Sequence, residues 1–141
     1  MTKLFSVKKH SLDMDVVLLI IRVITGLAFI QHGFGKIQNP FHWMGADAPV
    51  PAIFQALAAL SEFGGGFALI LGLLTRLGAF GITCTMIVAV YTHAAVMGDP
   101  FVNATGGRSY ELAMIYLGVS LAVLIFTPGR FSADRAIFGS K

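Results

Sequence analysis

Four long apolar runs, separated by shorter polar stretches, make up more than half of the 141-residue chain. They extend over about 16–35, 52–74, 77–97 and 110–127. A helix rises 1.5 Å per residue, so about 20 residues cross the 30 Å hydrocarbon core of a bilayer. The runs lack the alternation of β-strands, and a backbone in hydrocarbon must pair its polar groups internally. The pattern predicts one all-α domain over residues 1–141, an integral membrane four-helix bundle.

Composition excludes a soluble globular protein. The chain is 56% hydrophobic and 12% charged, whereas soluble domains are about 45–50% apolar and about 25% charged. The first apolar run follows three lysines, as the core of a signal peptide does. It is long for such a core, however, and no Ala-x-Ala cleavage site follows it. We therefore expect this run to remain in the protein as the first of four spans.

Lysines and arginines outside the apolar runs favour one side of the predicted bundle. Seven lie on the side of the two chain ends: Lys3, Lys8, Lys9, Arg76, Arg130, Arg135 and Lys141. The other side has only Lys36 and Arg108. Because short loops rich in Lys and Arg stay in the cytoplasm, this distribution predicts a multi-pass protein with both termini cytoplasmic. The net charge of +3 belongs to these flanks, so it indicates contact with anionic membrane lipids and not with nucleic acid.

The first two apolar runs contain ionisable side chains. Arg22 and His32 lie in the first run, and Glu62 lies in the second. A charged group near the bilayer centre costs about 2.5–3.5 kcal/mol on insertion scales, so such residues normally face the protein interior or a water-filled cavity. Arg22, His32 and Lys36 share one face of the predicted helix, within an arc of about 80°. This face must therefore be turned toward protein or water.

The second predicted helix carries a stripe of small residues beside Glu62. Gly64, Ala68 and Gly72 recur every four residues, which lets another helix backbone approach closely. Arg22 lies on the inner half of the first helix, but its long side chain can rise toward Glu62. Because two opposite charges in hydrocarbon cost less together than apart, we expect Arg22 and Glu62 to pair.

Four more polar residues lie at the outer ends of the predicted helices, at depths from which their side chains can approach Glu62. These are His32 and Lys36 at the end of the first helix, His93 at the end of the third and Glu111 at the start of the fourth. Together they predict a polar cavity in the outer half of the bundle. The loop over residues 41–50 contains aromatic side chains suited to the headgroup level, and we expect it to cover this cavity.

The alternative is that these groups serve packing alone. In that case Arg22 and Glu62 form a structural salt bridge, and Glu111 pairs with Arg108 one turn earlier. The histidines are then satisfied by backbone carbonyls, and the 41–50 loop is only an interfacial anchor.

Metal and nucleophile chemistry have less support. A di-iron bundle requires Glu-x-x-His pairs, which the sequence lacks. His32 and His93 match the comparable depth expected of haem ligands only loosely. Cys84 is the only cysteine, and a lone cysteine inside an apolar helix is usually a small hydrophobic residue. We expect no metal and no intrinsic cofactor.

Several short motifs follow one another along the chain. They are Arg22, His32-Gly33-x-x-Lys36, Glu62-x-Gly64-Gly65, Gly72-Leu73-Leu74-Thr75-Arg76, Glu111 and Pro128-Gly129-Arg130-x-Ser132-x-Asp134. In this order and spacing the chain resembles the DoxX family of small four-helix bacterial membrane proteins. The resemblance implies a plasma-membrane protein associated with redox systems, because the family includes subunits of thiosulfate:quinone oxidoreductase. Relatives of the same fold act as assembly or cargo factors, so the resemblance supports the fold more than the reaction.

Two function classes follow. In the first, the chain is a quinone-facing subunit of an oxidoreductase. His32 or His93 exchanges protons, Glu62 holds the local charge, and Arg22, Lys36 and Glu111 bind the ligand. Histidine suits proton exchange because its ordinary pKa of about 6.5 lies near working pH.

In the second class, the chain is a non-catalytic scaffold or assembly factor. It then binds another membrane or periplasmic protein, or a second copy of itself, through its small-residue faces.

Overall fold

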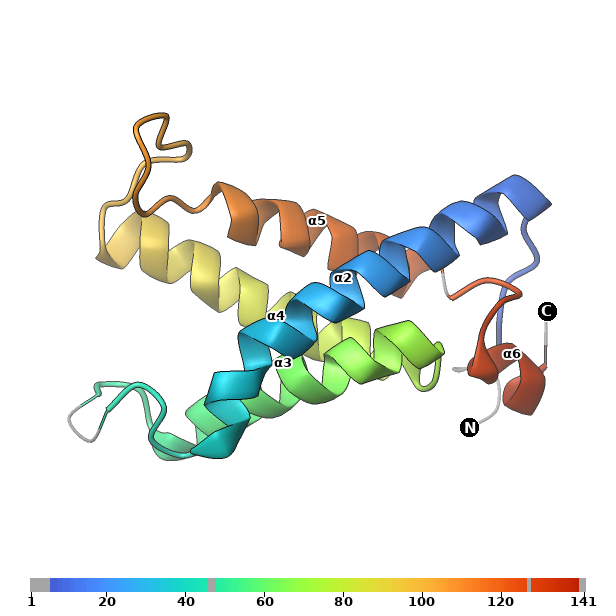
Figure 1. Ribbon diagram of the computed structural model, residues 1–141, viewed down its shortest axis with the longest axis horizontal. Coiled ribbons are helices and arrows are strands. Elements are labelled where there is room, and N and C mark those ends of the chain that lie inside the picture. The colour runs from blue at the N-terminus through green and yellow to red at the C-terminus, as the bar shows by residue number, and fades with distance from the viewer. Residues whose placement is uncertain (1–5, 46–47, 127, 140–141) are drawn as a thin grey trace.

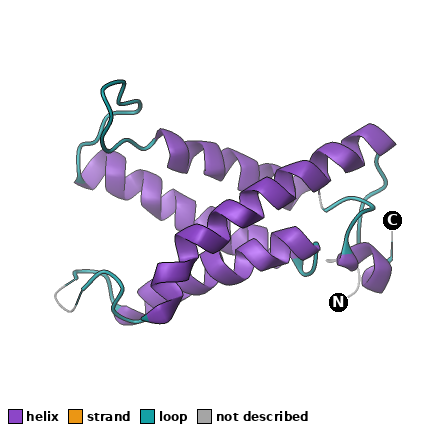
Figure 2. Cartoon of the chain, viewed as in Figure 1, coloured by secondary structure: helices purple, strands orange, loops and turns teal. Residues whose placement is uncertain are grey.

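The computed structural model describes residues 6–45, 48–126 and 128–139 (Figures 1 and 2). Its helices are α2 (Leu12–Gln38), α3 (Ala52–Leu71), α4 (Thr75–Tyr91), the π-helix η1 (Thr92–Val96), α5 (Glu111–Phe126) and the short α6 (Ala133–Phe138). The predicted all-α fold with four long helices is therefore confirmed. Two elements, η1 and α6, were not predicted.

The boundaries of the first two helices differ from those predicted. α2 begins at Leu12 and not at residue 16, because the Ser11 side chain accepts a hydrogen bond from the Met14 N–H and caps the helix. Two aspartates in the first turn suit the positive end of the helix dipole. α3 stops at Leu71 because Gly72 adopts a left-handed conformation (φ 64°) and closes the helix. The last residue of the fourth predicted helix, 127, lies outside the described residues.

The helices form two pairs that diverge toward one end of the molecule. α2 packs along α3 and α5 along α4, and α3 also packs against α4, whereas α2 and α5 make much less contact. Figure 1 shows the pairs separating at the left, where the loops between α2 and α3 and between α4 and α5 lie. We call this the loop end. The opposite end, which carries α6 and both chain termini, is the terminal end.

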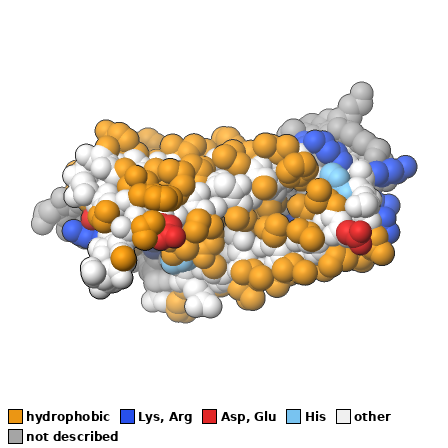
Figure 3. All heavy atoms as spheres, turned by 90° about the horizontal axis from the view of Figure 1, so that it is seen from above, with side chains coloured by type: hydrophobic (Ala, Val, Ile, Leu, Met, Phe, Trp, Pro, Cys, Tyr) orange, Lys and Arg blue, Asp and Glu red, His pale blue; other side chains and the backbone are white. Residues whose placement is uncertain are grey.

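The surface is apolar along most of the length of the bundle. Large side chains such as Ile24, Leu60 and Val88 are more than half exposed. On the face shown in Figure 3, hydrophobic side chains cover the length of the molecule and Lys and Arg gather mainly at the terminal end. Within the described residues, Ala52–Leu71 and Thr75–Val96 are long and apolar enough to cross a membrane, and Glu111–Phe126 is apolar but shorter.

Glycine allows α2 and α3 to approach at backbone distance. A Cβ atom on Gly66 of α3 would lie 2.8 Å from the Gly26 carbonyl oxygen of α2. A Cβ atom on Gly33 of α2 would lie 2.5 Å from the Phe63 backbone nitrogen of α3. No side chain fits at either position, so this helix pair depends on glycine at both.

The small-residue stripe predicted on α3 is only partly a helix contact. A Cβ atom on Gly64 would meet only Leu60 of its own helix, at 3.4 Å, so Gly64 makes no tight contact with another helix. Ala68 instead packs against α4, where a Cβ atom on Gly78 would lie 2.8 Å from the Ala68 Cβ. The prediction failed because residues 64–66 are each about 100° apart around the helix, and Gly66 rather than Gly64 faces α2.

Arg22 is fully buried and binds backbone carbonyls at the terminal end. Its Nε donates to the Leu69 carbonyl at 3.0 Å and its Nη2 to the Phe131 carbonyl at 2.9 Å, while Nη1 donates to the Pro128 carbonyl. The predicted Arg22–Glu62 pair is therefore wrong. Leu69 lies near the C-terminal end of α3, where helix carbonyls lack intrahelical partners. It is seven residues beyond Glu62, about 10 Å along the helix.

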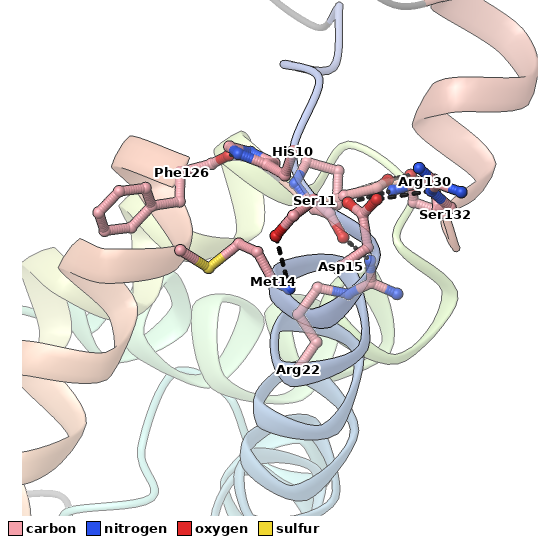
Figure 4. Close-up of polar contacts among 10 residues, drawn as sticks. His10, Ser11, Met14, Asp15, Arg22, Phe126, Arg130 and Ser132 are labelled. Carbon is pink, nitrogen blue, oxygen red and sulfur yellow. Dashed lines mark hydrogen bonds and ion pairs between the residues drawn. The ribbon is translucent and has the colours of Figure 1, made fainter.

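Two buried carboxylates hold the segment 128–134 against the helices. Asp15 of α2 accepts hydrogen bonds from the Arg130 backbone N–H at 3.0 Å and from its Nε at 2.6 Å (Figure 4). Asp134 accepts from the backbone N–H groups of Leu74 and Thr75 at 2.7 and 2.9 Å, which caps the start of α4. The terminal end is therefore closed by side chains that join α2, the α3–α4 turn and the segment 128–134.

We predict that Arg22→Leu strongly destabilises the protein in detergent. A hydrogen bond to a charged group contributes about 1.5–3 kcal/mol, and the substitution removes such a bond from each of three carbonyls. The unfolding temperature of Arg22→Lys should lie between those of Arg22→Leu and the unsubstituted protein, because an ammonium keeps the charge but not the guanidinium fork. Thermal unfolding of the purified protein measures the effect, with Ile24→Val on the exposed face of α2 as the control. Equal unfolding temperatures for Arg22→Leu and Ile24→Val would contradict this role.

Candidate functional site

A cleft of about 220 Å³ opens between the two helix pairs at the loop end. It is lined by Phe29, His32 and Lys36 of α2, Glu62 of α3, Met86 and Ala89 of α4, His93 of η1, Ser109, and Leu112, Ala113 and Tyr116 of α5. All four long helices contribute. The cleft therefore lies between the two helix pairs, where they diverge.

Four of the six predicted site residues line this one cleft: His32, Lys36, Glu62 and His93. The structure does not bring Arg22 there, because its guanidinium is bound at the terminal end. Glu111 is the first residue of α5 and is not part of the lining. The catalytic and ligand-binding roles of all six residues stay predictions.

Glu62 is a buried carboxylate with one of its two oxygens paired. Its Oε1 accepts a hydrogen bond from the Lys36 Nζ at 2.6 Å, and its side chain is 3% exposed. Its Oε2 is also buried and has no hydrogen-bond partner among the described residues. A buried polar atom without a partner costs about 1–3 kcal/mol, and more when the group is charged. The cleft is therefore lined by a strong acceptor that no described residue satisfies.

The loop after α2 contacts Lys36 but does not cover the cleft. Trp43 places its ring 4.5 Å from the Lys36 Nζ and donates its Nε1–H to the Gln55 carbonyl at 2.9 Å. The Gln55 side chain in turn accepts from the Met44 N–H and donates to the Val50 carbonyl. These bonds hold the loop on the first turn of α3, and none of its described residues lines the cleft. The predicted lid over 41–50 is therefore wrong for the described part; residues 46–47 lie outside it.

His93 is oriented by an acid that the sequence analysis missed. Its Nδ1 lies 2.7 Å from the Asp99 Oδ2, and the Arg108 Nε lies 3.6 Å from the other carboxylate oxygen. A π-helix carries His93, and Gly98 in a left-handed conformation (φ 69°) turns the chain so that Asp99 reaches it. The sequence signal was Gly-Asp-Pro directly after the helix. The alternative of an Arg108–Glu111 pair is not what the structure shows.

His32 belongs to an aromatic wall of the cleft. Its ring lies 6.0 Å from that of Tyr116 and 6.2 Å from that of Phe29, and the rings of Phe29 and Tyr116 are 4.9 Å apart. These are ordinary distances for edge-to-face and tilted aromatic pairs. Tyr116 was not predicted, because nothing in the sequence shows which side of the fourth helix faces the first.

The described residues contain no group of three His, Cys, Asp or Glu side chains that could hold a metal ion. Cys84 is exposed on α4. It faces the apolar exterior of the bundle, where a small hydrophobic side chain is equally at home.

The DoxX family model matches residues 17–95, which include most of α2, all of α3 and α4 and much of η1. The chain belongs to the DoxX family. It is 32% identical to the inner membrane protein YqjF of Escherichia coli over 87% of this chain and 93% of that protein. It is 29% identical to the putative oxidoreductase CatD of Bacillus subtilis over 87% of this chain and 88% of that protein. No solved structure matches the chain.

An uncharacterized protein of Haemophilus influenzae is 30% identical over 84% of this chain and 88% of its own length. These relationships establish a membrane protein and confirm the family resemblance drawn from the motifs. The structure also explains most of the terminal motif, since Pro128, Arg130 and Asp134 make the contacts that close the terminal end.

We predict that Lys36 and Glu62 depend on each other. Lys36→Leu and Glu62→Leu should each lower the unfolding temperature, because each leaves the other charge without its partner. The double substitution should recover part of the loss, with a coupling energy of about 0.5–3 kcal/mol. Arg22→Leu combined with Glu62→Leu is the matched control and should show additive losses. Additivity in the Lys36 cycle would show that the 2.6 Å contact does not stabilise the protein.

Proposed function

We propose that this DoxX protein is a bacterial plasma-membrane subunit of a quinone-linked redox system, with the quinone headgroup in the loop-end cleft. The observation that carries the proposal is the placement of His32, Lys36, Glu62 and His93 around one small cleft. One relative, CatD, is named a putative oxidoreductase, which supports the same class.

The size and walls of the cleft suit an aromatic headgroup. Its volume of about 220 Å³ is below the roughly 300–1,000 Å³ of sites for drug-sized ligands, so it fits a single ring with small substituents. The rings of Phe29, His32 and Tyr116 supply surfaces against which a flat ring packs edge-to-face or offset. In this proposal Lys36 and Glu62 bind the headgroup, and Arg22 has a structural role.

His93 is the residue that exchanges protons in this proposal. Reduction of a quinone to a quinol takes up two electrons and two protons. The electrons come from a partner subunit of the redox system. Asp99 fixes Nδ1 of His93, so the ring presents Nε2 as its exchangeable position.

The alternative, a scaffold that binds partners through small-residue faces of α3, has less support. Gly66 and Gly33 are used in the contact between α2 and α3, and Ala68 and Gly78 in the contact between α3 and α4. These four residues are therefore occupied within the chain, whereas Gly64 meets only its own helix. An outside partner would find only part of the stripe free.

We predict that the terminal end faces the cytoplasm, so that the cleft opens on the periplasmic side. The basis is the excess of Lys and Arg at the terminal end. A reporter that is active only in the periplasm should be inactive when fused after Lys141 and active when inserted at Gly107, in the loop between η1 and α5. The reverse pattern would invert the topology and move the cleft to the cytoplasmic side.

We predict that a short-chain quinone, in at least one redox form, raises the unfolding temperature of the purified protein. His32→Ala and Glu62→Gln should reduce this protection, because each removes a side chain from the cleft wall. Arg135→Ala at the terminal end is the control and should leave it unchanged. No protection in either redox form, or equal protection in all variants, would reject the cleft as a quinone site.

A further inference from the structure

The unpaired carboxylate oxygen in the cleft restricts what a ligand must offer. Glu62 already receives the Lys36 ammonium on Oε1, and its Oε2 has no donor among the described residues. Its side chain is 97% buried. The terminal torsion of a glutamate turns easily. A hydrogen-bond donor that enters the cleft can therefore meet this oxygen, whereas a carbonyl oxygen would be repelled by it.

The aromatic wall restricts the shape of the group that carries the donor. The rings of Phe29, His32 and Tyr116 lie together on the same cleft as Glu62. A flat ring fills the space beside them better than a branched or flexible head. These two observations, one electrostatic and one steric, describe a ring that bears a hydroxyl group.

A second, open hollow lies along α2 and forms a groove there. It measures about 550 Å³ and is lined by Ile24, Leu27, Ala28, Gln31 and His32. His32 also lines the cleft, so the groove and the cleft are adjacent at this residue. The groove lies on an exposed and mostly apolar face of α2, on the part of the helix that runs toward the middle of the bundle. An alkyl chain attached to the ring has its apolar path there, open to surrounding lipid.

We propose that the cleft selects a membrane-dissolved phenol or quinol, with its hydroxyl donating to Glu62 and its tail in the groove along α2. The inference rests on the proposed function and makes it narrower. A quinol carries two O–H donors, whereas the oxidised quinone carries two carbonyl acceptors and no donor. The reduced form therefore binds better than the oxidised form, and the ligand enters sideways from the lipid.

The test compares ligands that differ only in the donor, using the intact purified chain in one detergent. 4-Nonylphenol and 4-nonylanisole share a ring and a tail, but the anisole has a methyl ether in place of the hydroxyl. Decylhydroquinone, kept reduced without oxygen, and decylquinone form the redox pair. We expect the two hydroxyl compounds to bind at least tenfold more tightly, as measured by shifts of the unfolding temperature over a concentration series.

Variants locate the two parts of the site. Glu62→Gln should remove most of the preference for the hydroxyl compound, whereas Asp13→Asn, an exposed acid at the start of α2, should keep it. Ala28→Phe fills the groove and should weaken the binding of 4-nonylphenol. The binding of phenol, which has no tail, should not change. If Glu62→Gln does not fold, the ligand pairs on the unsubstituted chain still decide the question.

The outcomes separate this inference from the function it rests on. Equal affinity for phenol and anisole, or tighter binding of quinone than of quinol, would overturn the donor requirement and leave a quinone site in place. Absence of binding by every quinone, quinol and phenol would overturn both. An Ala28→Phe protein that binds 4-nonylphenol normally would show that the tail does not lie along α2.

Discussion

The positive charge of Arg22 cannot reach water, and the terminal half of the structure is organised to meet that constraint. Three backbone carbonyls from two distant parts of the chain receive its guanidinium. Those carbonyls are available only if α3 ends near Leu69 and the segment 128–134 folds back beneath the helices. Asp15 and Asp134 complete the arrangement, each with both oxygens in use. One buried cation thus holds α2, the end of α3 and the segment 128–134 together.

The loop end follows the opposite principle. There the helix pairs diverge, and the polar groups line a space and pair only in part. The Lys36–Glu62 pair joins α2 to α3, and the His93–Asp99 pair lies on the other side of the cleft; among the described residues no hydrogen bond joins the two pairs. A half-satisfied carboxylate is costly for stability, and such unsatisfied groups are typical of places where a protein binds something else.

Features that depend on a single helix were predicted well from the sequence. Features that depend on how two helices pack together were predicted poorly. Apolar run length predicted the four long helices, and charge inside those runs singled out Arg22, His32 and Glu62. The partner of Arg22 was wrong because backbone carbonyls at a helix end leave no mark in the sequence. The places of Asp99 and Tyr116 in the site were not predicted, because a π-helical turn and the rotation of α5 about its axis decide where their side chains point. Gly66 was passed over for Gly64 because adjacent glycines cannot be told apart without knowing which neighbour each one faces.

The closure of the terminal end has a consequence for the order in which the chain is made. Asp15 and Arg22 lie in α2, whereas their partners Pro128, Arg130 and Phe131 are translated more than 100 residues later. Until those residues are made, α2 therefore carries two polar groups that lack most of their final partners. They depend on water, lipid headgroups or the insertion machinery until the segment 128–134 is in place. A truncated product keeps those charges uncompensated, which gives membrane quality control a direct chemical difference between finished and unfinished molecules.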